Sequence, residues 1–265
     1  MIVIGERINA TRKHIFAAIE KRDTKFIQDE AMNQIKSGAN LIDINAGGKP
    51  DREISDMEWL VKTVREVTDV PLCIDSANPS AIELGLSLQG KAKPMINSIT
   101  NEEERLNKIL PLVKKYNSDV VALTIEAGGI PTTAQRRIEI AKSMLTKVKD
   151  FGIPLSNVYV DPCIFPVSTD SKQAIVSMDT IRGVKQMFPE VKSVVGLSNV
   201  SYGLPARVIV NSAFLILLLS AGLDAAIIDP TEKKMMTALR AANALLDKDE
   251  YCLEYITASR EGLFS

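Results

Sequence analysis

Aspartate and asparagine side chains recur where short runs of aliphatic and β-branched residues end, and they are the first candidates for chemistry in this chain. The members of this set are Asp43, Asn45, Asp75, Asn97, Asp161 and Asn199. Carboxylates and carboxamides together supply hydrogen-bond acceptors and donors. They suit a flat, uncharged heterocycle, because one carboxylate can accept from a ring N–H and from an exocyclic amino group. The residues themselves therefore predict a neutral, hydrogen-bonding ligand.

Other catalytic chemistries have few candidates. The only histidine, His14, lies away from these runs, which argues against a Ser-His-Asp triad and a multi-histidine metal site. Lys49, the nearest lysine, stands in a Gly-Gly loop. The cysteines at 73, 163 and 252 form no CxxC pair, which argues against zinc and iron–sulfur sites. We expect no metal bound by the chain, and we expect Cys73 and Cys163 to be packing residues.

Charge and composition restrict the partners. The net charge is −1, so we expect neither nucleic acid nor a membrane surface as a partner. Hydrophobic residues make up 46% of the chain, which is enough for a large core. Glu6 and Arg7 come too early for a signal peptide, and the apolar stretch 213–221 is too short to span a bilayer. The sequence therefore predicts a cytoplasmic protein.

A strand-like run followed by an amphipathic helical stretch repeats along the chain. The predicted strands cover residues 2–5, 41–45, 72–75, 94–97, 120–124, 158–161, 193–197 and 224–229. The predicted helices cover 23–37, 54–67, 79–88, 102–116, 133–150, 171–187, 205–221 and 231–246. Asn78 before Pro79 is typical of a helix start.

Eight such units favour one fold over its rival. Strands that are apolar at nearly every position are typical of a parallel sheet covered by helices on both faces. Eight βα units in a chain of this length predict a (β/α)8 TIM barrel, one domain over residues 1–265. An open doubly wound sheet is the alternative, but no GxGxxG loop follows the first predicted strand. In a barrel, the polar residues at the strand ends meet at one end.

Short motifs at these strand ends carry a resemblance to a known family. They are IGERIN at 4–9, DIN at 43–45, CIDS at 73–76, MINS at 95–98, DP at 161–162, GLSNVS at 196–201 and GLDAA at 222–226. In this order they resemble the pterin-binding methyltransferases. That family includes the methyltetrahydrofolate:corrinoid protein methyltransferases and the folate domain of cobalamin-dependent methionine synthase. The resemblance spans the whole chain.

The resemblance implies a role for each matched position. Asp75, Asn97 and Asp161 would hydrogen-bond the pterin edge. Asn199 would approach N5, which carries the methyl group, and Asp43 would sit near that end through a water network.

Further positions would shape or support this site. Gly196 and Ser198 would form the pocket floor, while Asn9, Asn45 and Ser76 would support the residues that touch the ligand. Ser76 is as easily interpreted as a helix cap. We expect Glu6 and Arg7 to pair with each other or with neighbours at the barrel's edge.

The implied reaction is exchange of the N5 methyl group of methyltetrahydrofolate with the cobalt of a corrinoid, by SN2 transfer with hydrogen-bond activation at N5. The chain has no Asp-x-His-x-x-Gly segment, so the corrinoid (a cobalamin) would be supplied by a partner protein. Family relatives are homodimers, so a homodimer through the outer helices is expected here.

Alternatives remain open. Dihydropteroate synthase, a related pterin barrel, holds a pyrophosphate with basic residues at late strand ends, where this chain has Ser198-Asn199 and Asp229-Pro230. A non-catalytic folate-binding module is a third possibility. At single positions the plainer interpretations are a helix start at Asp229-Pro230 and solvated surface charge at Arg136-Arg137.

Overall fold

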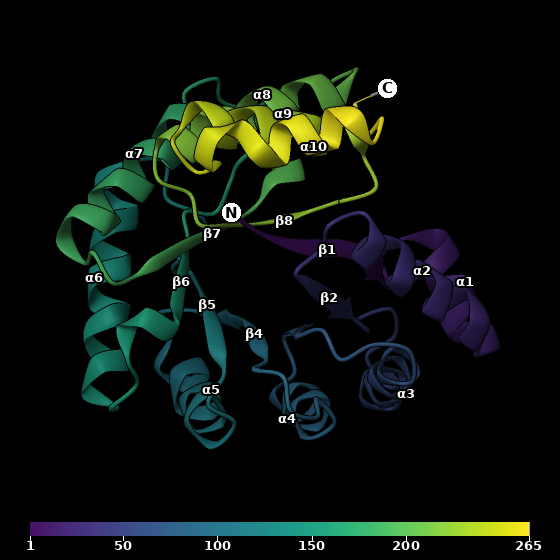
Figure 1. Cartoon of the computed structure of the whole chain (residues 1–265). Helices are drawn as coiled ribbons and strands as arrows, with labels where there is room; N and C mark the ends of the chain where they lie inside the picture. Colours follow the sequence, from purple (N-terminus) through teal and green to yellow (C-terminus); the bar gives the residue numbers. More distant parts are fainter. Residues whose placement is uncertain (265) are drawn as a thin grey trace.

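Eight parallel strands pair in chain order and close on themselves, as the computed structural model of the chain shows for residues 1–264 (Figure 1). The prediction of a (β/α)8 barrel is therefore confirmed, and the open-sheet alternative is wrong. The strands are β1 (Ile2–Asn9), β2 (Leu41–Asn45), β3 (Leu72–Asp75), β4 (Met95–Ile99), β5 (Asp119–Leu123), β6 (Val158–Asp161), β7 (Lys192–Gly196) and β8 (Ala225–Ile228).

Helices surround the barrel, and all eight predicted helices are present (Figure 1). They are α2 (Thr24–Lys36), α3 (Glu53–Arg65), α4 (Pro79–Ser87), α5 (Glu103–Lys115), α6 (Ala134–Asp150), α7 (Gln173–Met187), α8 (Arg207–Ser220) and α9 (Lys233–Leu245). Two short helices were not predicted, α1 (Lys13–Lys21) and α10 (Leu253–Arg260). Neither begins with a side-chain cap, so the usual start signal is missing from the sequence.

The first strand is longer than predicted, and its ladder is irregular. The register of β1 against β2 shifts between Gly5 and Ile8, which is the mark of a bulge. Gly5 lies against α2, where a Cβ atom would come within 2.3 Å of Gln34 Oε1. That oxygen accepts from the Arg7 backbone N–H at 3.0 Å. Glycine is needed at position 5 because α2 packs so closely here.

The barrel interior is filled by a layer of side chains from seven strands. These residues are Ile4, Cys73, Met95, Val121, Tyr159, Val194 and Ala225, and all are at most 2% exposed. The layer closes the barrel below the end where the strands run into the following loops, which we call the mouth. Cys73 is part of this packing, as expected, and Cys163 is also buried.

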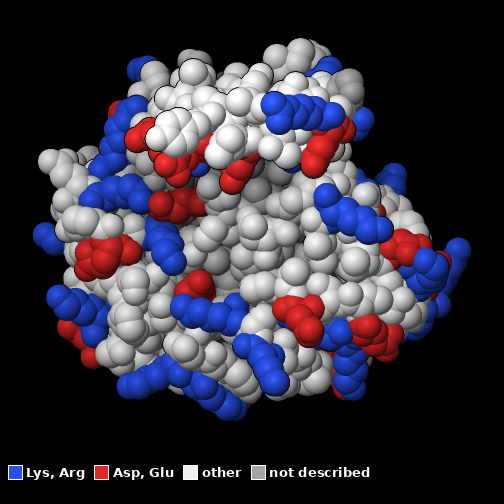
Figure 2. All heavy atoms as spheres, in the orientation of Figure 1, with Lys and Arg blue, Asp and Glu red and all other residues white. Residues whose placement is uncertain are grey.

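The surface carries charges of both signs. Figure 2 shows lysine and arginine interspersed with aspartate and glutamate around a central area of uncharged residues. Among the described residues, no helix is long and apolar enough to cross a membrane. Within the same part of the chain, no group of three or more histidine, cysteine, aspartate or glutamate side chains is arranged to hold a metal ion.

Candidate active site at the barrel mouth

The alternation of side chains along the strands brings the predicted polar residues to the mouth. Cys73 and Tyr159 belong to the inner layer. Asp75 and Asp161 follow them by two positions, so their side chains face into the barrel on the mouth side of that layer. Asn97 follows the inner-layer residue of β4 by the same offset.

Register then places three of these residues side by side. Asn45 pairs with Asp75, and Asp75 pairs with Asn97 across the β2–β3–β4 ladder. Asn45 Nδ2 donates to Asp75 Oδ2 at 2.9 Å, so the carboxylate is oriented from its neighbouring strand. The peptide bond from Asn97 to Ser98 is cis.

Ser76 stabilises the turn after Asp75. Its hydroxyl donates to Glu53 Oε1 at 2.6 Å and accepts from the Asn78 backbone N–H at 2.9 Å. Its own backbone N–H donates to the Asn97 carbonyl at 3.1 Å. Asn78 caps α4, as predicted, by accepting from the Ser80 backbone N–H at 3.0 Å.

Asp43 is the most enclosed carboxyl group of the mouth. Only 2% of it is exposed, and its Oδ1 atom has no hydrogen-bond partner. Burial raises the pKa of Asp43 well above its ordinary value, and the nearby charge of Asp75 raises it further. Hydrogen bonds from the Cys73 thiol and the Asn97 amide act in the opposite direction. Burial likewise raises the pKa of Asp75, against the hydrogen bond from Asn45.

Asp161 accepts a backbone hydrogen bond and lies near the positive charge of a buried arginine. Burial raises the pKa of Asp161 to about 6. The opposing effects are the Cys163 backbone N–H, which donates to Oδ1 at 2.7 Å, and the positive charge of Arg137.

The expectation that Arg137 is solvated surface charge is wrong, because this side chain is fully buried. Arg137 Nε donates to the Pro131 carbonyl at 2.7 Å and Nη2 donates to Gln173 Oε1 at 2.5 Å. Arg136, its neighbour in sequence, is exposed and pairs with Glu126, as a surface charge would.

Asn199 lies on a different kind of support, the 3-10 turn η2 (Leu197–Ser201) that follows β7. Asn199 is exposed, and its Nδ2 atom lies close to Gly196: a Cβ atom at position 196 would be only 3.3 Å from it. Arg207 Nη2 donates to the Ser198 carbonyl at 2.6 Å, and its Nε donates to the Ser201 hydroxyl at 3.0 Å. The turn that carries Asn199 is therefore fastened by the first residue of α8.

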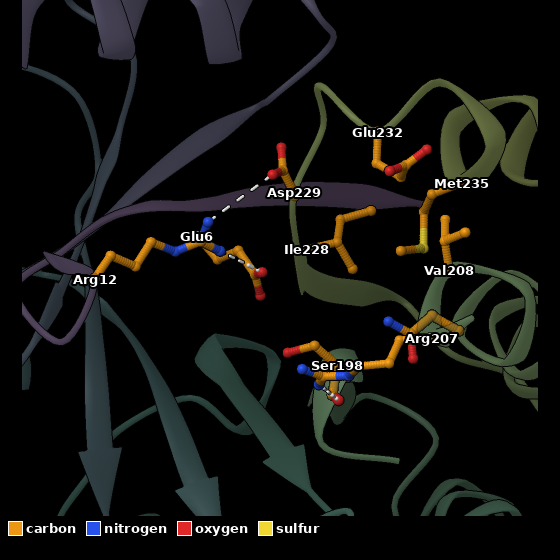
Figure 3. A pocket seen from close by; sticks show the side chains of 10 residues that line it. Glu6, Arg12, Ser198, Arg207, Val208, Ile228, Asp229, Glu232 and Met235 are labelled. Carbon is orange, nitrogen blue, oxygen red and sulfur yellow. Dashed lines mark hydrogen bonds and ion pairs between the residues drawn. The ribbon is translucent and has the colours of Figure 1, made fainter. Parts of the chain in front are cut away.

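A cavity of about 440 Å³ opens beside Ser198. Figure 3 shows Glu6, Arg12 and Asp229 on one side of it, with Ser198 and Arg207 across from them. Asp75, Asn97 and Asp161 are not among the residues that line this cavity.

Of the two outcomes expected for Glu6 and Arg7, pairing with neighbours is the one observed. Arg12 Nη2 lies 2.7 Å from Glu6 Oε1, and Arg7 pairs with Glu30 and Asp229.

Asp229 does not begin a helix. α9 starts at Lys233, with Glu232 as the capping residue. Asp229 belongs to a charge network instead, because it pairs with Arg7 and lies 4.0 Å from Arg12.

Asn9 has a local role. Its Oδ1 atom accepts from the Thr11 backbone N–H at 2.9 Å and from the Thr11 hydroxyl at 2.7 Å, which shapes the turn into α1.

Sequence reasoning missed the arginines that serve the mouth. Arg105, Arg137 and Arg207 each stand in the first turn of a helix after a strand, and Arg12 precedes α1. The observation that strands 7 and 8 end without basic residues is correct, yet Arg12 and Arg207 reach the same edge from flanking segments. These arginines could have been predicted from one signal: each lies in or near the first turn of a helix that closely follows a polar strand end.

Comparison with known proteins agrees with this geometry. The model of the pterin-binding enzymes matches residues 5–229. The chain belongs to the pterin-binding enzyme family. One relative is the methylcorrinoid:tetrahydrofolate methyltransferase of Eubacterium limosum, which is 35% identical over 264 residues, covering 99% of this chain and 97% of that protein.

Other members of the pterin-binding family match less completely. The methionine synthase of Mycobacterium tuberculosis is 32% identical over 241 residues, but the match covers 86% of this chain and only 20% of the synthase. Two solved dihydropteroate synthases share the fold, one from Yersinia pestis (TM-score 0.68, 17% identity, 93% of this chain and 94% of that chain) and one from Xanthomonas albilineans (TM-score 0.72, 16% identity, 92% and 93%). At this identity the likeness concerns the fold alone.

Proposed function

We propose that this pterin-binding enzyme is a methyltransferase that moves a methyl group between N5 of tetrahydrofolate and the cobalt of a corrinoid carried by a separate protein. The observation that carries the proposal is the end-to-end similarity to a methylcorrinoid:tetrahydrofolate methyltransferase. The mouth agrees with it, because it offers carboxylates and carboxamides for a neutral ring.

The pterin edge would bind to Asp75, Asn97 and Asp161. All three project into the barrel from strand ends, and β3 and β4 place the first two as direct neighbours. An ionised carboxylate accepts from both a ring N–H and an exocyclic amino group, and such charge-assisted bonds are the stronger kind. With its pKa at about 6, Asp161 is mostly ionised at neutral pH.

The chemical step would transfer the methyl group without a covalent enzyme intermediate. In one direction the cobalt–carbon bond breaks with both electrons left on cobalt, which goes from cobalt(III) to cobalt(I). The N5–carbon bond forms, and N5 loses its proton to solvent. In the other direction N5 must first gain positive character, because a neutral tertiary amine leaves poorly. Asn199 would supply a hydrogen bond that strengthens as charge develops there, which favours the transition state over the ground state.

The cavity beside Ser198 would hold the rest of the folate. Its volume of about 440 Å³ lies within the range of small-molecule sites. Glu6, Asp229 and Glu232 line it together with Arg12 and Arg207. Because Arg12 already pairs with Glu6, Arg207 is the cation that would meet a carboxylate of the glutamate tail.

The test of the reaction is spectroscopic. The protein is mixed without oxygen with methyltetrahydrofolate and cob(I)alamin, and the cobalt(I) absorption band is followed. We expect conversion to methylcob(III)alamin, and the reverse reaction with methylcob(III)alamin and tetrahydrofolate. Folate binding by calorimetry with no methyl transfer to free or protein-bound corrinoid would point instead to a binding module. Condensation of pterin pyrophosphate with p-aminobenzoate would identify a dihydropteroate synthase.

The role of Asn199 is tested in the same assay. Asn199→Ala should lower turnover by about tenfold to a hundredfold while the Kd for methyltetrahydrofolate changes less than about threefold, since the bond acts in the transition state. Asn33→Ala on the exposed end of α2 is the matched control. Equal losses in affinity and rate would assign Asn199 to binding alone.

We also propose that the protein forms a homodimer through α8. One face of this helix exposes Ile209 (63%), Ile216 and Leu217 (49%), with the exposed Ala213 between them. The spacing of these residues makes a single apolar stripe, which is typical of an interface. Leu217→Glu should give monomers in size-exclusion chromatography with light scattering, while Ile54→Glu, at an exposed position on α3, should not.

The compartment proposed is the cytoplasm. The cysteines Cys73, Cys163 and Cys252 are free thiols, which suits a reducing environment. Fractionation of the source cells with an antibody against the chain would test this.

A further inference from the structure

Arg105, in the first turn of α5, donates only to backbone carbonyls of the mouth. Its Nε and Nη2 atoms lie 2.9 and 2.6 Å from the Ser98 carbonyl oxygen. Nη2 also lies 2.9 Å from the Ser76 carbonyl oxygen, and Nη1 lies 2.5 Å from that of Ala77. One guanidinium group thus joins three carbonyls, two from the turn after β3 and one from the end of β4.

The three carbonyls belong to the residues that follow two proposed pterin contacts. Ser76 and Ala77 come directly after Asp75, and Ser98 comes directly after Asn97. Arg105 therefore adds a side-chain connection between the ends of β3 and β4 to the ladder that already pairs Asp75 with Asn97. Only a planar group with several donors in a fixed fork can reach all three carbonyls at once, and a lysine ammonium cannot.

The positive charge of Arg105 also acts on Asp75. The groups that face Asp75 are Asn45 and Asp43 from β2, Glu53 from α3 and Arg105 from α5. Glu53 raises the pKa of Asp75, while Asn45 and Arg105 lower it. Arg105 is the only cation among these groups.

We propose that Arg105 is a positioning residue for folate binding, which sets the spacing of Asp75 and Asn97 by joining the turn after β3 to the end of β4 and places a positive charge near Asp75. This inference rests on the proposed function. The residue does not line the cavity beside Ser198, and it acts through the Ser76, Ala77 and Ser98 carbonyls.

Two substitutions distinguish the effect of the guanidinium hydrogen bonds from the effect of the positive charge. Arg105→Lys keeps the charge and loses the fork, whereas Arg105→Gln loses the charge and keeps at most two donors. Arg182→Lys and Arg182→Gln, at an exposed position on α7, are the matched controls. The Kd for methyltetrahydrofolate is measured by calorimetry between pH 5 and pH 8, together with the melting temperature and the turnover at saturating folate.

We expect Arg105→Lys to raise the Kd about tenfold without moving its pH dependence, since each lost hydrogen bond to a charged group is worth a factor of roughly ten. Arg105→Gln should raise the Kd further and shift the acidic loss of binding to higher pH, because the pKa of Asp75 rises when the cation is removed. Turnover at saturating folate should change less than about threefold in both, since the bound ring is then already in place.

The outcomes distinguish this inference from the proposed function. If the wild type binds methyltetrahydrofolate and both Arg105 variants match it, the inference is overturned and the proposed function stands. A fall in turnover and melting temperature together, with the pH profile unmoved in Arg105→Gln, would show a merely structural role and would also overturn it. A wild type without folate affinity overturns both. Should Arg105→Gln fail to fold, Arg105→Lys against Arg182→Lys decides.

Discussion

The mouth of the barrel has two dissimilar sides. The strand side consists of Asp43, Asp75, Asn97 and Asp161, which stand at alternating positions of β2, β3, β4 and β6. Asp43 and Asp161 are buried and Asp75 is partly buried, and burial raises the pKa of each. Because strand backbones are fixed by ladders on both sides, these side chains are held in place before any ligand arrives.

The rim side is built differently. Glu6, Arg12, Asn199, Arg207 and Asp229 come from a strand bulge, a 3-10 turn and the segments that flank helices. Arg12 pairs there with Glu6, Arg207 donates to the Ser198 carbonyl, and Asn199 is exposed.

The difference fits the two reactants of the proposed reaction. A neutral ring is recognised by buried acceptors that are already oriented, whereas a corrinoid on another protein must approach through an open side. The comparison predicts that substitutions on the strand side alter affinity and stability strongly, and that those on the rim side alter turnover with smaller effects.

The largest effect is expected for Asp75→Ala. Loss of two charge-assisted hydrogen bonds should weaken methyltetrahydrofolate binding by about 4 kcal/mol, or roughly a thousandfold. Calorimetry of this variant is compared with Asp51→Ala, an exposed carboxylate in the β2–α3 loop, for which we expect no change. A loss of affinity below tenfold for Asp75→Ala would show that the strand side does not recognise the ligand.

Asp161→Asn should raise the free energy of unfolding relative to wild type, and this difference should grow as pH rises. The pKa of Asp161 goes from 3.8 to about 6 on folding, so wild-type stability is full below pH 3.8 and falls as pH rises through 6. At about 1.4 kcal/mol per pKa unit, the cost above pH 6 is about 3 kcal/mol, and asparagine avoids it. Urea unfolding at pH 4 and pH 7.5 measures this, with Asp179→Asn on the surface of α7 as control. A stability difference that is the same at both pH values would contradict the burial of a charge here.

Gly196→Ala is the corresponding test of the rim side. A Cβ atom at this position would stand 3.3 Å from Asn199 Nδ2, so the exposed amide must shift by a few tenths of an ångström. We expect turnover to fall about fivefold, or ~1 kcal/mol, with the folate Kd nearly unchanged. Gly128→Ala, whose Cβ atom would meet nothing within 4 Å, is the control. Unchanged turnover would show that the position of this amide does not matter to the transfer.

The smallest effect is expected for Glu6→Gln. Burial raises the pKa of Glu6, but the side chain is 18% exposed and pairs with Arg12, which is 30% exposed. Pairs with this exposure contribute under about 1 kcal/mol, so the unfolding free energy should change by less than that amount. If Glu6→Gln changes the unfolding free energy as much as Asp161→Asn in the same urea experiment, the two sides of the mouth do not differ in how they hold charge.

Much of the strand side was predictable because its placement is a local property. Side chains alternate along a strand with a period of two, so a polar residue two positions after an inward apolar one faces the same way. This rule places Asp75, Asn97 and Asp161 from their own segments alone. The repeated βα pattern likewise predicted all eight strands and eight of the helices around them.

Tertiary structure alone decided the partners of the arginines. Arg105 contacts the Ser76 carbonyl 29 positions away, and Arg7 contacts Asp229 222 positions away. A long, flexible side chain can reach in many directions, so its sequence neighbours do not indicate where its fork binds. Arg137 illustrates the limit: beside Arg136 it has the pattern of surface charge, yet it lies fully buried near Asp161. Periodicity along one segment determined which residues face the mouth, whereas packing between distant segments determined what holds them there.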